Sequence, residues 1–357
     1  MTGKERISRI LKHQPVDRIG LSEHFWDDTY KTWIEQGHIK PDTEIDLLFG
    51  YDMRRAWVFN FVADLDFENQ TIREDKDTIT VLNGNGATLR YQKYRDGVPE
   101  HVDFMVKDRE GWEKHIKPKL VADRRRIDFE AYREHKRIAE ENDMYFMAAG
   151  LNVFEAMHPV CGHEYLLMGM ALDPDWVKDM VYTYSRLIVE LYEMLFQEEG
   201  YPDGLFIYED LGYKGSPFMS PAMYEELVKP GHVYTIDYAK KHGMSVIMHS
   251  CGFIEPLLPS LIDAGIDGYN AIEVKAGMDL LKIHKLYGDK IIFMGGIDVR
   301  AICSNDKAEI DRELEAKIPI VKQGYNFILH SDHSIPNTVE YETYRYFIKK
   351  GLELGTY

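Results

Sequence analysis

Cysteine is scarce in this chain of 357 residues, and long apolar runs are missing from it. The three cysteines, Cys161, Cys251 and Cys303, form an odd set without a CxxC pair, which favours a reducing compartment where a functional cysteine acts as a thiolate. No apolar stretch approaches the roughly 18 residues that span a bilayer, and the N-terminal residues lack the apolar core of a signal peptide. We therefore expect a cytoplasmic protein with no membrane segment and no membrane partner.

Basic residues are also few, because 43 lysines and arginines face 60 acidic residues and the net charge is −17. This excess repels nucleic-acid phosphates, so we expect no nucleic-acid partner. The densest basic cluster, Arg124–Arg126, is more typical of a solvated face. Neither a P-loop nor a GxSxG elbow is present, and Gly84-Asn85-Gly86 fits a hairpin turn better than a dinucleotide loop. Phosphoryl transfer and serine hydrolysis thus lose their usual support.

Apolar strands and helices alternate regularly after residue 142, a pattern that is typical of parallel βα units. With a first strand at 18–21 and another near 54–60, the chain has enough strands to close an α/β (βα)8 TIM barrel. A doubly wound open sheet is the alternative. The six later strands are expected at 144–149, 204–208, 244–248, 266–270, 290–294 and 325–329.

The segment of about 66–120 has a different pattern, the alternation of an antiparallel meander with turns at Asn85-Gly86 and Asp96-Gly97. A helix over 2–13, capped by Thr2, and helical segments within 28–50 precede it. No linker rich in proline, glycine or serine divides the chain. We therefore expect one barrel domain over residues 1–357, with an N-terminal helical and antiparallel-strand insertion.

Titratable and amide side chains gather where the expected strands end. Reactive groups of (βα)8 barrels lie at the carboxyl ends of the strands, so these residues predict an active site. They are Glu23, His24, Glu209, Asp210, His249, Cys251, Asn270, Glu273, Asp298, His330, Asp332 and His333.

His249-Ser250-Cys251 is the most specific of these groups. Residues two apart on an extended backbone point to the same side, so this imidazole and thiolate can converge on one metal ion. A zinc site needs a third ligand, and His330–His333 is the richest neighbouring source. The alternative is a buried cysteine beside a histidine that is satisfied by the backbone. Cys161-Gly162-His163 lies in an expected helix, where residues two apart diverge.

Several segments resemble the uroporphyrinogen decarboxylase superfamily, and within it the cobalamin-dependent methyltransferase branch. They are 12–19, 209–226, His-Ser-Cys-Gly at 249–252, Gly-Gly-Ile-Asp at 295–298 and 323–329. The resemblance covers nearly the whole chain and also implies a (βα)8 barrel. In the thiol methyltransferases of this branch, a His-x-Cys pair and a later cysteine hold zinc. His249 and Cys251 match the pair, whereas the position of the later cysteine falls on His333.

The resemblance implies a zinc-dependent methyltransferase that works with cobalamin on a partner corrinoid protein. Exchange of a thiolate for imidazole leaves zinc more electrophilic, which suits a small O-methyl or methanol-type donor. We expect His249, Cys251 and His333 to bind the metal, and Glu209, Asp210 or Glu23 to act as the catalytic carboxyl group. The residues expected to bind substrate are His24, Asn270, Glu273, Asp298, His330 and Asp332.

Three alternatives stay open at this point. The first is a methylcorrinoid:thiol methyltransferase. The second is a uroporphyrinogen decarboxylase-like enzyme, although the acidic segment 22–28 would repel a polycarboxylate substrate. The third is a barrel that binds a corrinoid protein without catalysis.

Overall fold

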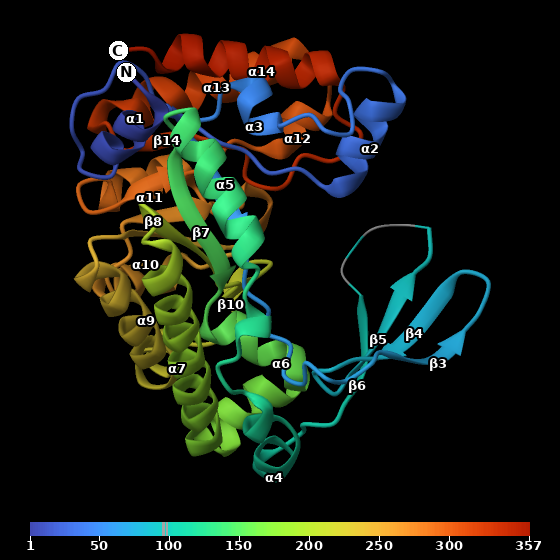
Figure 1. The fold of residues 1–357 in the computed structure, drawn as a ribbon. Coiled ribbons are helices and arrows are strands. Elements are labelled where there is room, and N and C mark those ends of the chain that lie inside the picture. The colour runs from blue at the N-terminus through green and yellow to red at the C-terminus, as the bar shows by residue number, and fades with distance from the viewer. Residues whose placement is uncertain (95–96, 98) are drawn as a thin grey trace.

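The computed structural model describes residues 1–94, 97 and 99–357. Its eight-stranded parallel sheet has the order β1-β14-β13-β12-β11-β8-β7-β2 and is nearly closed into a barrel (Figure 1). Apart from β1 and β2, the barrel strands that follow one another along the chain are thus neighbours in the sheet, as in a (βα)8 barrel. The expected fold is confirmed. The strands are β1 (Gly20–Leu21), β2 (Met53–Trp57), β7 (Tyr145–Leu151), β8 (Gly204–Tyr208), β11 (Ser245–Ser250), β12 (Gly268–Ala271), β13 (Ile292–Met294) and β14 (Phe327–Leu329).

Helices surround this sheet and connect its strands (Figure 1). The first begins as predicted, because the Thr2 side chain accepts a hydrogen bond from the Glu5 amide (3.2 Å). None of the helices in the described part of the chain has the length and apolar character needed to cross a bilayer. The helices are α1 (Gly3–Ile10), α2 (Asp27–Glu35), α3 (Ile45–Phe49), α4 (Arg109–Gly111), α5 (Phe129–Glu141), α6 (Val153–Leu172), α7 (Pro174–Glu199), α8 (Pro221–Met223), α9 (Lys229–Lys241), α10 (Leu258–Asp263), α11 (Leu280–Tyr287), α12 (Val299–Cys303), α13 (Lys307–Val321) and α14 (Tyr341–Gly355).

Apolar side chains fill the part of the barrel interior near the amino-terminal ends of the strands. They come from alternate strand positions, and Ile7 and Ile10 of α1 close the amino-terminal end of the barrel. This interior cluster includes Met53, Met147, Phe206, Ile247, Met294 and Ile328. Because that part of the barrel is packed, a ligand can enter only near the carboxyl ends of the strands.

The meander forms a separate antiparallel sheet that projects from the barrel at the right of Figure 1. Its strands are β3 (Gln70–Glu74), β4 (Thr78–Leu82), β5 (Ala87–Gln92) and β6 (Glu100–Phe104), and a two-residue pair, β9 (Gly212–Tyr213) and β10 (Ser216–Pro217), lies elsewhere. The Asn85-Gly86 turn is confirmed, because the Gly86 amide donates to the Asn83 carbonyl (2.9 Å) between β4 and β5. The Asp96-Gly97 turn lies partly outside the described residues. That the whole chain forms one domain stays a prediction.

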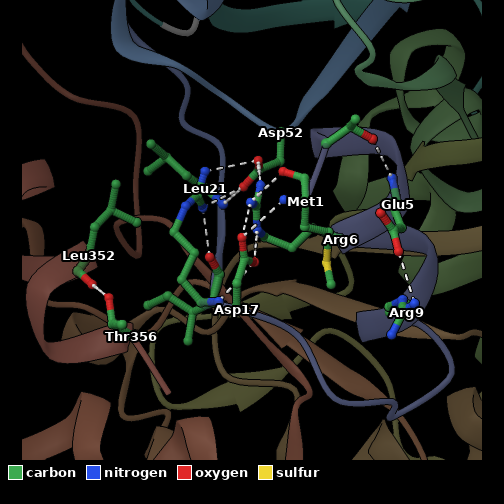
Figure 2. A network of polar contacts seen from close by, with 12 residues as sticks. Met1, Glu5, Arg6, Arg9, Asp17, Leu21, Asp52, Leu352 and Thr356 are labelled. Carbon is green, nitrogen blue, oxygen red and sulfur yellow. Dashed lines mark hydrogen bonds and ion pairs between the residues drawn. The ribbon is translucent and has the colours of Figure 1, made fainter.

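A buried ion network joins β1 to β2, the two strands at the ends of the sheet order. Among the described residues no backbone ladder connects them, and Asp52 takes its place. The Asp52 carboxylate accepts hydrogen bonds from Arg18 (2.7 Å), the Leu21 amide (2.8 Å) and Arg6. Arg6 also binds Asp17 (2.7 Å), as Figure 2 shows. This network holds the amino-terminal end of the β1–β2 seam.

Asp52→Asn should lower the free energy of unfolding by roughly 3–5 kcal/mol, because two guanidinium groups would lose their buried anion. Asp52 is only 2% exposed. Arg137→Gln is the control, because it removes only exposed ion pairs to Glu134 and Glu141 and should leave the free energy of unfolding nearly unchanged. Urea denaturation of both variants tests this, and equal losses would contradict the role given to Asp52.

Candidate metal centre and the cavity beside it

Asp210, His249 and Cys251 form a compact cluster at the carboxyl ends of β8 and β11. His249 Nε2 lies 3.2 Å from Cys251 Sγ and 3.6 Å from an Asp210 carboxylate oxygen. Among the described residues, only these three bring ligand atoms within 4.8 Å of one another. The alternation of β11 thus makes the imidazole and the sulfur converge. The cluster offers one nitrogen, one sulfur and one oxygen ligand, so it is a possible metal-binding triad.

Asn270 fixes the ring of His249. Its side-chain amide nitrogen donates to the Met294 carbonyl (2.9 Å), so its oxygen accepts from His249 Nδ1 (2.6 Å). The Nδ1 hydrogen is therefore used, and the Nε2 lone pair points toward Cys251 Sγ. This is the arrangement in which an outer partner orients a metal-binding histidine.

The loop that carries Cys251 depends on Gly252. The Gly252 backbone has φ of +77°, and a Cβ atom there would lie 2.3 Å from the backbone of Gly212. The Cys251 amide donates to Asp210 (2.8 Å), and the Gly252 amide donates to Glu273 (2.8 Å). Burial, reinforced by Asp210, raises the pKa of the Cys251 thiol well above its ordinary value. A cation bound here would therefore replace the thiol proton.

A cavity of about 190 Å³ lies beside the cluster. Several residues that the sequence singled out line it: His24, Asp210, His249, Cys251, Asn270, His330 and His333. His24 Nδ1 bonds with Ser334 (2.8 Å), and desolvation of the ring together with the charge of Arg55 lowers the pKa of His24 to about 3. The His333 ring lies 5.9 Å from that of Trp26 and outside the metal cluster. Asp210, and not His333, thus lies within the compact group with His249 and Cys251, and the expected role of His333 as a ligand stays a prediction.

Glu23 and His330 form a buried pair behind this cavity. A Glu23 carboxylate oxygen lies 3.1 Å from His330 Nδ1, and Glu23 also accepts from the amide of Ser331 (2.9 Å). Burial raises the pKa of Glu23 to about 8 and lowers that of His330 well below its ordinary value. His330 Nδ1 faces the Ser331 carbonyl (2.6 Å), whereas Nε2 is buried without a hydrogen-bond partner.

Glu209 lies away from the cavity, although its neighbour Asp210 lines it. The Glu209 carboxylate is fully buried and accepts from the amides of Phe154 (2.8 Å) and Glu155 (3.0 Å) at the start of α6. His232 contacts the same carboxylate and bonds through Nδ1 with Tyr224 (2.7 Å). Glu209 therefore holds the N-terminus of α6 and does not line the cavity.

Three of the expected substrate-binding residues also accept hydrogen bonds from backbone amides. Asp332 accepts from Val274 (2.8 Å) and Val299 (2.7 Å), and its burial raises its pKa to about 6. Asp298 caps α12 through the Arg300 amide (2.9 Å). The Glu273 carboxylate accepts the hydrogen bond from the Gly252 amide that is described above. None of the three lines the cavity, so the structure places them in the loops that shape it.

Arg55, Trp26 and Tyr208 also line the cavity, although no sequence motif singled them out. A signal for Arg55 was present, because Met53, Arg55 and Trp57 occupy alternate positions of β2 and Met53 lies in the barrel interior. An arginine in that register is an unusual inward charge.

Cys161 and His163 make separate contacts and do not form a pair of ligands. Gly162 interrupts the backbone of α6 with φ of +71°, and the buried Cys161 thiol contacts the Met157 carbonyl. His163 stacks on His158 with 4.3 Å between the ring centroids.

Elemental analysis of the purified protein should find one divalent metal ion per chain, lost in Asp210→Ala, His249→Ala and Cys251→Ala. His333→Ala should keep the ion, because His333 lies outside the cluster. Cys303→Ser is the control for loss of a thiol elsewhere. Retention in Asp210→Ala together with loss in His333→Ala would reverse the assignment of the third ligand.

Asn270→Ala should weaken metal binding by roughly 10–100-fold, because His249 would lose the partner that orients its ring. Competition with a chromogenic chelator measures the affinity, and circular dichroism checks that the variant is folded. Unchanged affinity in the folded variant would contradict this role of Asn270.

Comparisons with known proteins add the family. No curated protein matches the chain. Similar solved structures include a Xaa-Pro dipeptidase with bound methionine, at 14% identity and a TM-score of 0.31, with 63% of this chain and 58% of that one covered. Xylanase B from Clostridium stercorarium F9 is another, at 12% identity and a TM-score of 0.35, with 62% and 80% covered. The chain thus spans less than two thirds of the length of the dipeptidase.

The family comparison is far more extensive. The model of the family described as "Uroporphyrinogen decarboxylase (URO-D)" matches residues 76–351, which is more than half of the chain. The match includes ten of the twelve candidate site residues, all except Glu23 and His24. The chain therefore belongs to the uroporphyrinogen decarboxylase family, whose superfamily contains decarboxylases and related methyltransferases.

Proposed function

We propose that the protein is a zinc-dependent methyltransferase that moves a methyl group from a small O-methyl or methanol-type donor to cobalamin on a partner corrinoid protein. The observation that carries this proposal is the convergence of His249 Nε2 and Cys251 Sγ, 3.2 Å apart, beside Asp210 and a cavity. Membership of a superfamily that includes methyltransferases supports it.

The ligand set fits zinc. Nitrogen, sulfur and oxygen ligands from three residues are typical of catalytic zinc sites, which keep a further position open for a substrate. Asn270 supplies the outer hydrogen bond that orients His249. The cavity of about 190 Å³ lies on the side where a substrate would enter.

Zinc held by these residues would supply Lewis acidity toward the oxygen of the donor. A carboxylate in place of a second thiolate favours this use, because thiolates donate more charge to the metal. In the proposed reaction the methyl carbon–oxygen bond breaks and its electron pair stays on the oxygen. The methyl carbon is attacked by the cobalt(I) of the corrinoid, which provides the pair for the new bond.

The carboxyl groups then divide into separate roles. Asp210 binds the metal, and Glu209 positions the start of α6. Glu23, protonated near neutral pH, acts on the cavity through His330 and is a positioning residue. His330 Nε2 accepts a hydrogen bond from the donor molecule or a water, because the Nδ1 hydrogen faces the Ser331 carbonyl.

Incubation of the zinc-loaded protein with cob(I)alamin and a panel of methoxyarenes, methanol and methylthiols tests the proposal under anaerobic conditions. We expect spectral conversion to methylcobalamin with an O-methyl donor. His249→Ala and Cys251→Ser should lose more than the roughly 10–100-fold that an outer-partner mutation costs, whereas Cys303→Ser should keep full activity.

The panel also separates the alternatives. Consumption of methylthiols alone would favour the thiol methyltransferase. Release of carbon dioxide from a carboxylated substrate by the metal-free protein would favour a decarboxylase. If no donor is consumed in the presence of zinc and a corrinoid protein, the proposed function is wrong.

A further inference from the structure

Arg55 is a cation inside the barrel without a carboxylate partner. It lines the cavity beside the metal cluster and an adjoining cavity of about 540 Å³ at the β1–β2 seam. Its guanidinium carbon lies 4.6 Å from the centre of the Phe206 ring, and one nitrogen donates to the Glu23 carbonyl (2.9 Å). No other hydrogen bond or ion pair of Arg55 occurs among the described residues. Most of its five N–H donors are therefore free for a ligand.

The groups around Arg55 leave its charge uncompensated. Glu44 and Asp46, which line the adjoining cavity, are both paired with Arg54 (2.8 and 2.6 Å). Glu23 turns its carboxyl group toward Ser331 and His330, and its backbone carbonyl toward Arg55.

The metal cluster does not compensate this charge either. A divalent cation held here would be neutralised by the Asp210 carboxylate and the Cys251 thiolate, which together would carry two negative charges. His24 and His330 are neutral near pH 7, because desolvation and the charge of Arg55 lower the pKa of both. The positive charge of the half-buried Arg55 would therefore remain without a counter-charge in the cavity, which is unfavourable away from bulk water.

The walls of the cavity suit a flat apolar ring. Tyr208 packs edge-on against Trp57 with 5.1 Å between centroids, and its ring lies 5.0 Å from that of His249. Trp26 also lines this cavity, and Trp57, which is 51% exposed, lines the adjoining one. A cavity of about 190 Å³ is close to the size of roughly 150 Å³ that holds a benzene ring.

His330 provides a second and independent sign of a ligand. The residue is only 3% exposed and lines this cavity, yet its Nε2 atom has no hydrogen-bond partner. A buried polar atom without a partner is unfavourable, so a hydroxyl group of the ligand, or a water molecule bound with it, is expected to donate a hydrogen bond to this nitrogen.

We propose that Arg55 is the anion-binding residue of the methyl-donor site, and that the donor is an aromatic methyl ether which carries a carboxylate group. The planar guanidinium binds a carboxylate through two parallel hydrogen bonds, and the aromatic walls hold the ring. A quaternary ammonium donor would also suit aromatic walls, but Arg55 repels it. This inference rests on the proposed function.

Binding is measured first, without any corrinoid, so that it does not depend on methyl transfer. Zinc-loaded protein is titrated with 4-methoxybenzoate and with neutral 4-methoxybenzamide by calorimetry. We expect the benzoate to bind more tightly, and Arg55→Gln to weaken its binding roughly 10–100-fold while the amide changes little. Arg55→Lys should recover part of the affinity, because it keeps the charge but lacks the planar fork. Arg133→Gln, which removes an exposed arginine paired with Glu199, is the control.

Methyl transfer from the same two compounds to cob(I)alamin is measured next. A loss of kcat/KM in Arg55→Gln that is confined to the benzoate, with zinc content unchanged, supports the inference. Equal use of both compounds and no effect of Arg55→Gln would overturn it while the proposed function stands. Arg55-dependent benzoate binding without methyl transfer from any donor would leave the anion site in place and remove the proposed function.

Discussion

The pairing of Asp52 with two arginines is the interaction on which the barrel depends. Eight strands close a barrel only if the first and second meet, and here β1 contributes just two residues to the sheet. Asp52 bridges this seam with its carboxylate, while its amide donates to the Leu21 carbonyl (2.9 Å). Each charge in such a buried network needs its partner, because removal of one partner leaves the other charge buried and unpaired.

The same seam determines where the cavity opens. Asp52 ties the strands together at their amino-terminal end, and toward the carboxyl end the seam widens into the cavity of about 540 Å³. His24, Arg55 and Tyr208 line both this cavity and the one beside the metal cluster. A short first strand thus provides the room in which a donor molecule can lie next to the metal ligands.

Neighbouring polar residues at the strand ends perform different tasks. Asp210 faces the cavity, whereas Glu209 binds the amide nitrogens at the start of α6. His330 lines the cavity, whereas Asp332 joins the loops after β12 and β13 through two amides. The buried carboxylates of Glu209 and Asp332 keep the loops rigid. A metal site needs such a rigid frame to hold its ligands in place.

The sequence by itself determined the number and places of the barrel strands, the hairpin in the meander and the convergence of His249 with Cys251. These follow from local rules, namely the apolar pattern of strands, the turn chemistry of Asn-Gly and the two-residue period of an extended chain. Only the tertiary structure decided that Asp210 lies by this pair while His333 packs near Trp26, that Glu209 turns away, and that Arg55 points inward. Those outcomes depend on which strands become neighbours and on how each chain leaves its strand, and both are set by contacts between residues far apart in the sequence.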